Sequence, residues 1–98
     1  MAEIRWTPQA EEDLDAIVHF IAKDSVQYSR FFVVDVFEAI ERLIQFPESG
    51  RIVPEIQESI IREIILGNYR IVYRFKSDTV ELLTIYHAAR LLDPSKLK

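Results

Sequence analysis

The sequence of 98 residues contains no cysteine, only two glycines and no long apolar run. The lack of cysteine excludes a disulfide framework, an iron–sulfur cluster and a thiolate nucleophile. No apolar run approaches the roughly 20 residues that a membrane helix needs, and residues 1–6 lack the apolar region of a signal peptide. We therefore expect a cytoplasmic protein, without a membrane partner, that depends on its hydrophobic core.

Signatures for phosphate and metal binding are missing as well. Neither a Gly-x-x-x-x-Gly-Lys loop nor a Gly-x-Gly-x-x-Gly loop occurs. The two histidines, His19 and His87, fall on different predicted elements, and no His-Glu-x-x-His motif is present. Acidic residues at 11–15 are more typical of a solvated helix face than of a cation site. The sequence predicts no cofactor and no metal site.

Charge is unevenly distributed along the chain. The net charge is −4, and 49% of the residues are hydrophobic and 29% charged, which is typical of a folded domain. Residues 1–49 contain ten acidic and four basic residues, whereas residues 50–98 contain six acidic and eight basic ones. We expect one domain over residues 1–98, with a loose tail at 91–98 and a local basic face. The acidic balance argues against indiscriminate nucleic-acid binding.

Helical periodicity fills the first half of the chain. A short strand is predicted at residues 3–6, and Thr7 followed by Pro8 is a helix start signal. Apolar residues then recur at helical spacing over 8–23 and again over 25–45. The sequence therefore predicts one strand followed by two amphipathic helices.

Strand patterns fill the second half. After a connector at 46–59, strands are predicted at 60–66, 69–76 and 79–87, and a Gly-Asn hairpin signal joins the first two. Apolar residues of the last strand fall on both parities, which predicts either a central strand covered on both faces or a β-bulge. The order β-α-α-β-β-β predicts an α+β fold, with a small antiparallel sheet packed on an N-terminal helical hairpin.

Basic side chains are the remaining candidates for a site. The candidate set is Arg62, Arg70, Arg74, His87 and Arg90. Because Arg70 and Arg74 share a strand face and the last strand ends near His87, we expect these side chains to converge in an antiparallel sheet. Guanidinium groups suit phosphate oxygens or an acidic protein surface, and histidine can carry a proton near neutral pH. The alternative is that Arg62 and Arg74 form ordinary surface pairs with Glu63, Glu81 or the acidic helices.

Two apolar residues fall on the polar face of the second predicted helix. Phe31 and Val34 lie on the face that Glu38 and Glu41 mark as polar. Either their surroundings bury this end of the helix, or the two residues form a docking patch for a partner.

Five short motifs stand in a characteristic order. They are WTPQAEEDL at 6–14, LIQFPESGR at 43–51, REI at 62–64, GNYRIVYR at 67–74 and HAAR at 87–90. With these motifs the sequence resembles the RelE/ParE toxin superfamily of bacterial type II toxin–antitoxin systems over nearly its whole length. The resemblance implies the same β-α-α-β-β-β fold and one of two activities. RelE-type members cut mRNA on the ribosome without a metal, whereas ParE-type members poison DNA gyrase.

The details of the resemblance favour the ParE type. Arg70 matches the arginine of the superfamily's Tyr-Arg-Leu-Val-Tyr-like strand, and Arg90 aligns with another catalytic arginine. Where RelE has lysines, however, this chain has Ile61 and Glu63, and residues 91–95 stand where nucleases place a tyrosine or a His-Tyr pair. The resemblance therefore implies a ParE-like toxin that inhibits DNA gyrase without covalent chemistry of its own.

The resemblance also implies partners. A cognate antitoxin would bind helix-in-groove, with Phe31 and Val34 as anchors, in a hetero-oligomeric toxin–antitoxin complex. Gyrase would contact the candidate basic set. Three alternatives remain: an mRNA interferase on the ribosome that uses Arg70, His87 and Arg90, a non-toxic relic that only binds its antitoxin, and an unrelated α+β scaffold.

Overall fold

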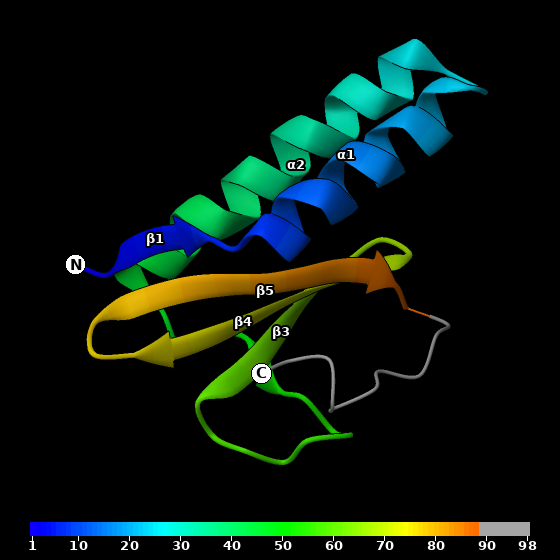
Figure 1. Ribbon diagram of the computed structural model, residues 1–98. Helices are drawn as coiled ribbons and strands as arrows, with labels where there is room; N and C mark the ends of the chain where they lie inside the picture. Colours follow the sequence, from blue (N-terminus) through cyan, green and yellow to red (C-terminus); the bar gives the residue numbers. More distant parts are fainter. Residues whose placement is uncertain (89–98) are drawn as a thin grey trace.

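Two helices cover one face of a five-stranded sheet in the computed structural model, which describes residues 1–88 (Figure 1). In chain order the elements are β1 (Glu3–Trp6), α1 (Pro8–Ala22), α2 (Val26–Gln45), β2 (Arg51–Ile52), β3 (Ile61–Leu66), β4 (Tyr69–Lys76) and β5 (Thr79–His87). These elements confirm the predicted α+β fold. The predicted tail at 91–98 and Arg90 lie outside the described residues.

The sheet is mixed, whereas the sequence predicted an antiparallel one. Its spatial order is β1-β5-β4-β3-β2, and β1 runs parallel to β5, with Glu3 opposite Thr79. The strand β2, inside the predicted connector, adds an antiparallel edge through Arg51 opposite Glu63. A two-residue strand is too short to show a period of two, and pairing between distant ends of the chain leaves no local sequence signal.

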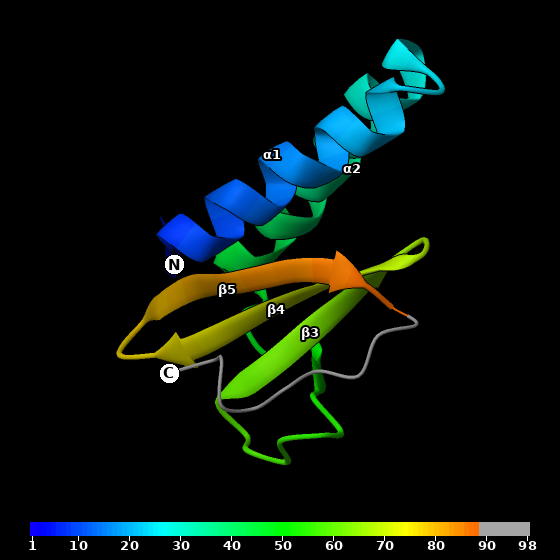
Figure 2. The same cartoon turned by 45° about the vertical axis from the view of Figure 1, so that its right-hand side comes forward.

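Hydroxyl caps start both helices. The Thr7 hydroxyl oxygen accepts a hydrogen bond from the Ala10 amide at 3.1 Å, and that of Ser25 accepts one from the Tyr28 amide at 3.1 Å. The Thr7 hydroxyl also donates to the Leu82 carbonyl at 2.7 Å, which attaches the start of α1 to β5. The far end of the hairpin, where α1 turns into α2, projects beyond the sheet (Figures 1 and 2).

The sheet separates two apolar clusters. The larger cluster, between helices and sheet, includes Val36, Ala39, Ile40, Leu43, Ile71, Tyr73, Val80, Leu82 and Ile85. The smaller cluster, on the opposite face, consists of Val53, Ile61, Val72 and Leu83, with Ile56 and Tyr86 packed against it. The central strands are therefore apolar on both faces, and each face needs a cover.

The strand β5 is both central and bulged. Val72 of β4 lies opposite Thr84, and the next residue of β4 lies opposite Leu82, so Leu83 has no opposite residue. The extra residue shifts the alternation, since Leu82 and Ile85 both enter the larger cluster while Leu83 enters the smaller one. Both alternatives that the mixed parity predicted are present together.

A buried tyrosine fixes the connector between α2 and β2. The Tyr73 hydroxyl donates to the Pro47 carbonyl at 2.8 Å and accepts from the Gly50 amide at 3.0 Å. A Cβ at Gly50 would lie 2.6 Å from the Tyr73 hydroxyl oxygen and 2.7 Å from the Glu63 carbonyl oxygen. Only glycine fits where the connector passes this close to the sheet.

We expect Gly50→Ala to lower the free energy of unfolding by about 1–3 kcal/mol, because the new methyl group must displace the tyrosine or the backbone. Gly67→Ala is the comparison variant: its Cβ meets open space, and only its positive φ of 57° is unfavourable, which costs about 1–2 kcal/mol. Urea unfolding followed by Trp6 fluorescence measures both. A Gly50→Ala variant as stable as the wild type would contradict the close fit.

Candidate functional site

Arg70 and Arg74 lie on the sheet face that turns away from the helices. They share this face with Val72 of the smaller cluster. The Arg74 guanidinium donates to Glu81 at 3.1 Å, and Glu81 also pairs with Arg5. The alternative interpretation, in which a strand arginine pairs with Glu81, is thus confirmed for Arg74.

Arg62 and His87 lie on the other face, toward the helices. Arg62 stands opposite Tyr73 and His87 opposite Tyr69, and both tyrosines belong to or pack on the larger cluster. Arg62 donates to a backbone carbonyl of the α2–β2 connector at 3.0 Å. The His87 ring packs edge-on against Tyr69, with ring centroids 5.5 Å apart. The structure therefore does not bring the four described residues of the candidate basic set together.

On the sheet face that turns away from the helices, charged side chains form a buried ion cluster together with one tyrosine. The cluster consists of Arg51, Glu55, Glu63, Arg70 and Tyr86. Arg70 is only 5% exposed and donates two hydrogen bonds of 2.8 Å to Glu55 and a third to Glu63. Glu63, 1% exposed, also accepts from Arg51 at 2.6 Å. The Arg70 guanidinium carbon lies 4.9 Å from the centre of the Tyr86 ring.

The buried ion cluster is internally compensated. The hydrogen bonds that Arg70 donates to Glu55 raise the pKa of Arg70, burial opposes this increase, and Glu63 adds to it. Burial raises the pKa of Tyr86 to about 12, against the opposing charge of Arg70. The Tyr86 hydroxyl has no hydrogen-bond partner among residues 1–88. Arg70 therefore stays charged at physiological pH, with three of its donors directed at carboxylates of its own chain.

The same cluster holds the connector over the second face of the sheet. Glu55 belongs to the segment that follows β2, and Val53 and Ile56 of this segment pack in the smaller cluster. The carboxylate of Glu55 ties the segment to Arg70 on β4. The helices thus cover one face of the sheet, and the segment that follows β2, residues 53–56, covers part of the other.

Sequence reasoning missed three members of the buried ion cluster: Glu55 and Tyr86, which contact Arg70, and Arg51, which pairs with Glu63. It paired Glu63 with other arginines, although a signal was present. In β3, Glu63 has the parity of Ile61, and a carboxylate on a strand face that is otherwise apolar indicates a buried charge with a partner.

The helices carry a second candidate surface. Phe31 is 54% exposed and Val34 is 52% exposed, so the interpretation that their surroundings bury this end of α2 is wrong. Other large exposed apolar side chains on the helices are Phe20, Val26, Tyr28 and Phe37. Exposed apolar side chains that lie together on one face are typical of a docking surface.

Within residues 1–88, neither helix is long and apolar enough to cross a membrane. In the same described part of the chain, no group of three or more histidine, aspartate or glutamate side chains is placed to hold a metal ion.

Comparison with known proteins agrees with the fold. Residues 4–92 match the family described as the ParE toxin of type II toxin–antitoxin system, parDE. Putative toxin Y4kP of Sinorhizobium fredii is 39% identical over 87 residues, which cover 87% of this chain and 86% of that protein. Toxin RelE2 of Caulobacter vibrioides is 32% identical over 92 residues, which cover 93% of this chain and all of that protein.

Solved structures share the architecture. A chain of the chromosomal ParDE TA system from P. aeruginosa superposes with a TM-score of 0.71 at 26% identity, over 89% of this chain and 96% of that one. The toxin–antitoxin complex RelBE2 from Mycobacterium tuberculosis gives a TM-score of 0.55 at 22% identity, over 88% and 96%. Fold and comparisons therefore define the class as a toxin of a type II toxin–antitoxin system within the RelE/ParE superfamily. Within that class, the chain belongs to the ParE toxin family.

We expect Arg70→Met to lower the free energy of unfolding by about 3 kcal/mol, because it leaves the buried carboxylate of Glu63 short of a counter-charge. Arg74→Met is the control, because the more exposed pair with Glu81 is worth about 1 kcal/mol or less. Adding Glu63→Gln to Arg70→Met should recover part of the loss. Urea unfolding measures the stability of all three variants. If Arg70→Met and Arg74→Met lowered the free energy of unfolding equally, the buried ion cluster would contribute no more to stability than an exposed ion pair.

Proposed function

We propose that this protein is a ParE-like toxin that inhibits DNA gyrase and is neutralised by a cognate antitoxin. The observation that carries the proposal is the engagement of Arg70 by Glu55 and Glu63. A ribonuclease of the RelE type needs a cation directed at the scissile phosphate to stabilise the charge that develops there. An arginine that is 5% exposed and bound to two carboxylates is poorly suited to that task.

The positions of the other candidate groups support the same proposal. His87, the general acid or base of the ribonuclease alternative, lies on the opposite sheet face from Arg70. General acid–base catalysis requires the groups to reach one substrate, within hydrogen-bond distance of the reacting atoms. The carboxylate of Glu63 stands where the resemblance places a lysine in RelE, and it compensates Arg70. Inhibition by binding needs no such convergence.

The comparison with the P. aeruginosa ParDE chain supports both the toxin type and the partner. That chain is 26% identical to this one and comes from a toxin–antitoxin system. We infer a cognate antitoxin for this protein, and we propose that Phe31 and Val34 on the exposed side of α2 anchor it. Gyrase would then contact the sheet face that turns away from the helices, through the partly exposed Arg74, and Arg70 would position the connector segment that follows β2.

A ribosome-dependent mRNA interferase remains the second candidate. It is favoured by the 32% identity to the Caulobacter protein named toxin RelE2. In this candidate Arg70, His87 and Arg90 would be the catalytic residues, and substrate binding would have to open the buried ion cluster to release Arg70.

The gyrase assay distinguishes the two candidates. We expect the purified toxin to inhibit DNA supercoiling by gyrase and to increase the amount of cleaved DNA, because a ParE-like toxin stalls the enzyme on broken DNA. The same preparation should leave mRNA intact on translating ribosomes. Toxin inactivated by premixing with its antitoxin is the control. Intact supercoiling together with cut mRNA would reject the proposal in favour of the interferase.

We expect Phe31→Glu to weaken antitoxin binding by about tenfold or more, because it places a charge where an aromatic anchor would be desolvated. The fold should survive, since the ring is half exposed. Phe46→Glu is the matched control: Phe46 is 64% exposed and lies at the opposite end of α2. Titration calorimetry with the antitoxin measures both affinities. An unchanged affinity for Phe31→Glu would remove Phe31 from the antitoxin surface.

A further inference from the structure

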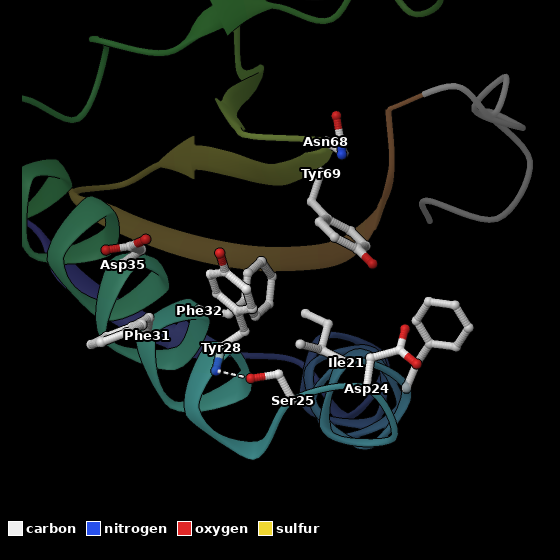
Figure 3. Close-up of a pocket in the computed structure, with 10 residues that line it drawn as sticks. Ile21, Asp24, Ser25, Tyr28, Phe31, Phe32, Asp35, Asn68 and Tyr69 are labelled. Carbon is white, nitrogen blue, oxygen red and sulfur yellow. Dashed lines mark hydrogen bonds between the residues drawn. The ribbon is translucent and has the colours of Figure 1, made fainter.

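A hollow of about 590 Å³ opens where the projecting end of the helical hairpin faces the β3–β4 turn. We call it the tip hollow. Its apolar lining includes Ile21 at the end of α1, Tyr28 and Phe32 at the start of α2, and Tyr69 at the start of β4. Figure 3 shows Tyr69 extending from the strand toward the helices, with Phe32 and Ile21 facing the same space. The hollow therefore joins the helical layer to the sheet.

The floor of the tip hollow is already packed. The rings of Phe32 and Tyr69 contact each other with centroids 5.1 Å apart, which fixes both side chains. Its rim is exposed: Tyr28 is 70% exposed and Phe20 is 64% exposed. Rigid apolar walls with an exposed aromatic rim suit a large apolar side chain from another protein.

Two carboxylates make the tip hollow negatively charged. Asp24 and Asp35 both line it, and Figure 3 places them on opposite sides of the opening. Among the described residues that line the hollow, none is basic. Desolvating this pair against an uncharged partner would be unfavourable, whereas a lysine or arginine beside the apolar side chain would compensate it.

Charge also argues against a second copy of this chain as the occupant. The hairpin belongs to the half of the sequence with ten acidic and four basic residues. Two hairpins placed face to face would bring like charges together, which destabilises an interface. These charges favour, as the occupant, a different protein that carries basic residues.

We propose that the tip hollow binds a segment of the antitoxin in which an aromatic or branched aliphatic side chain has a lysine or arginine within one helical turn. The assignment rests on the proposed function. It follows from continuity, since Phe31 lines the hollow and also belongs to the antitoxin surface proposed above. It also follows from the charge of Asp24 and Asp35. The basic residue contacts the aspartates, and the apolar side chain fills the space above Phe32 and Tyr69.

The test compares two isosteric double variants of the full chain. Asp24→Asn with Asp35→Asn removes both charges of the hollow. Glu12→Gln with Glu41→Gln removes two charges from exposed helix positions that do not line it. Affinity for the antitoxin encoded beside the toxin gene is measured at low and high salt. We expect the aspartate variant to bind about tenfold more weakly at low salt, with a smaller difference at high salt, and the control to stay within about twofold.

Each other outcome overturns the assignment. Equal weakening in both double variants would show that only the net charge of the hairpin matters. Loss of gyrase inhibition by free Asp24→Asn/Asp35→Asn toxin, with antitoxin affinity intact, would make gyrase the occupant. Self-association of the wild-type chain that this variant alters would make a second copy the occupant. The proposed function fails separately, if the wild-type toxin forms no antitoxin complex or leaves gyrase fully active.

Discussion

The contact of Arg70 with Glu55 and Glu63 holds the second face of the sheet closed. The strands β4 and β5 are apolar on both sides, so the sheet needs two covers. The helices cover one face and pack their own apolar residues against it. The other cover is a short connector segment with few apolar residues of its own. Buried Arg70 holds this segment on the sheet by binding one carboxylate in the segment and another in β3. The strand position that the superfamily resemblance marks as functional thus has a structural use in this chain.

Most of the fold could be predicted because its long elements have clear periods. The bounds of β4 and β5 agree with the predicted 69–76 and 79–87, and Thr7 caps α1 as predicted. What could not be predicted depends on distant parts of the chain. The parallel pairing of β1 is decided by the packing of the hairpin and not by local sequence, and β2 is an edge strand of two residues.

The candidate site was predicted less completely, for a physical reason. Alternation along a strand tells which side chains share a face, and it placed Arg70 and Arg74 together correctly. It cannot tell which acidic residue of a connector will fold back onto that face, so Arg70 looked available when Glu55 binds it. Phe31 and Val34 were easier to single out from the sequence, because apolar residues on a polar helix face contradict the pattern of a free surface helix. The sequence alone left open whether these two side chains are buried or exposed, and it could not show the hollow beside Phe31, whose lining includes Tyr69 from a different layer.

The parallel pairing of β1 with β5 also decides in what order the molecule can be completed during synthesis. Contacts between α1 and α2 join segments that are close in sequence and can form as soon as that part of the chain is available. The strand β1, although it is made first, has no sheet to join until residues 79–82 have been made. A chain that leaves the ribosome from its N-terminus therefore has its helical surface available before its sheet is closed. A partner that recognises the helical layer can meet the nascent toxin earlier than a partner that needs the finished sheet.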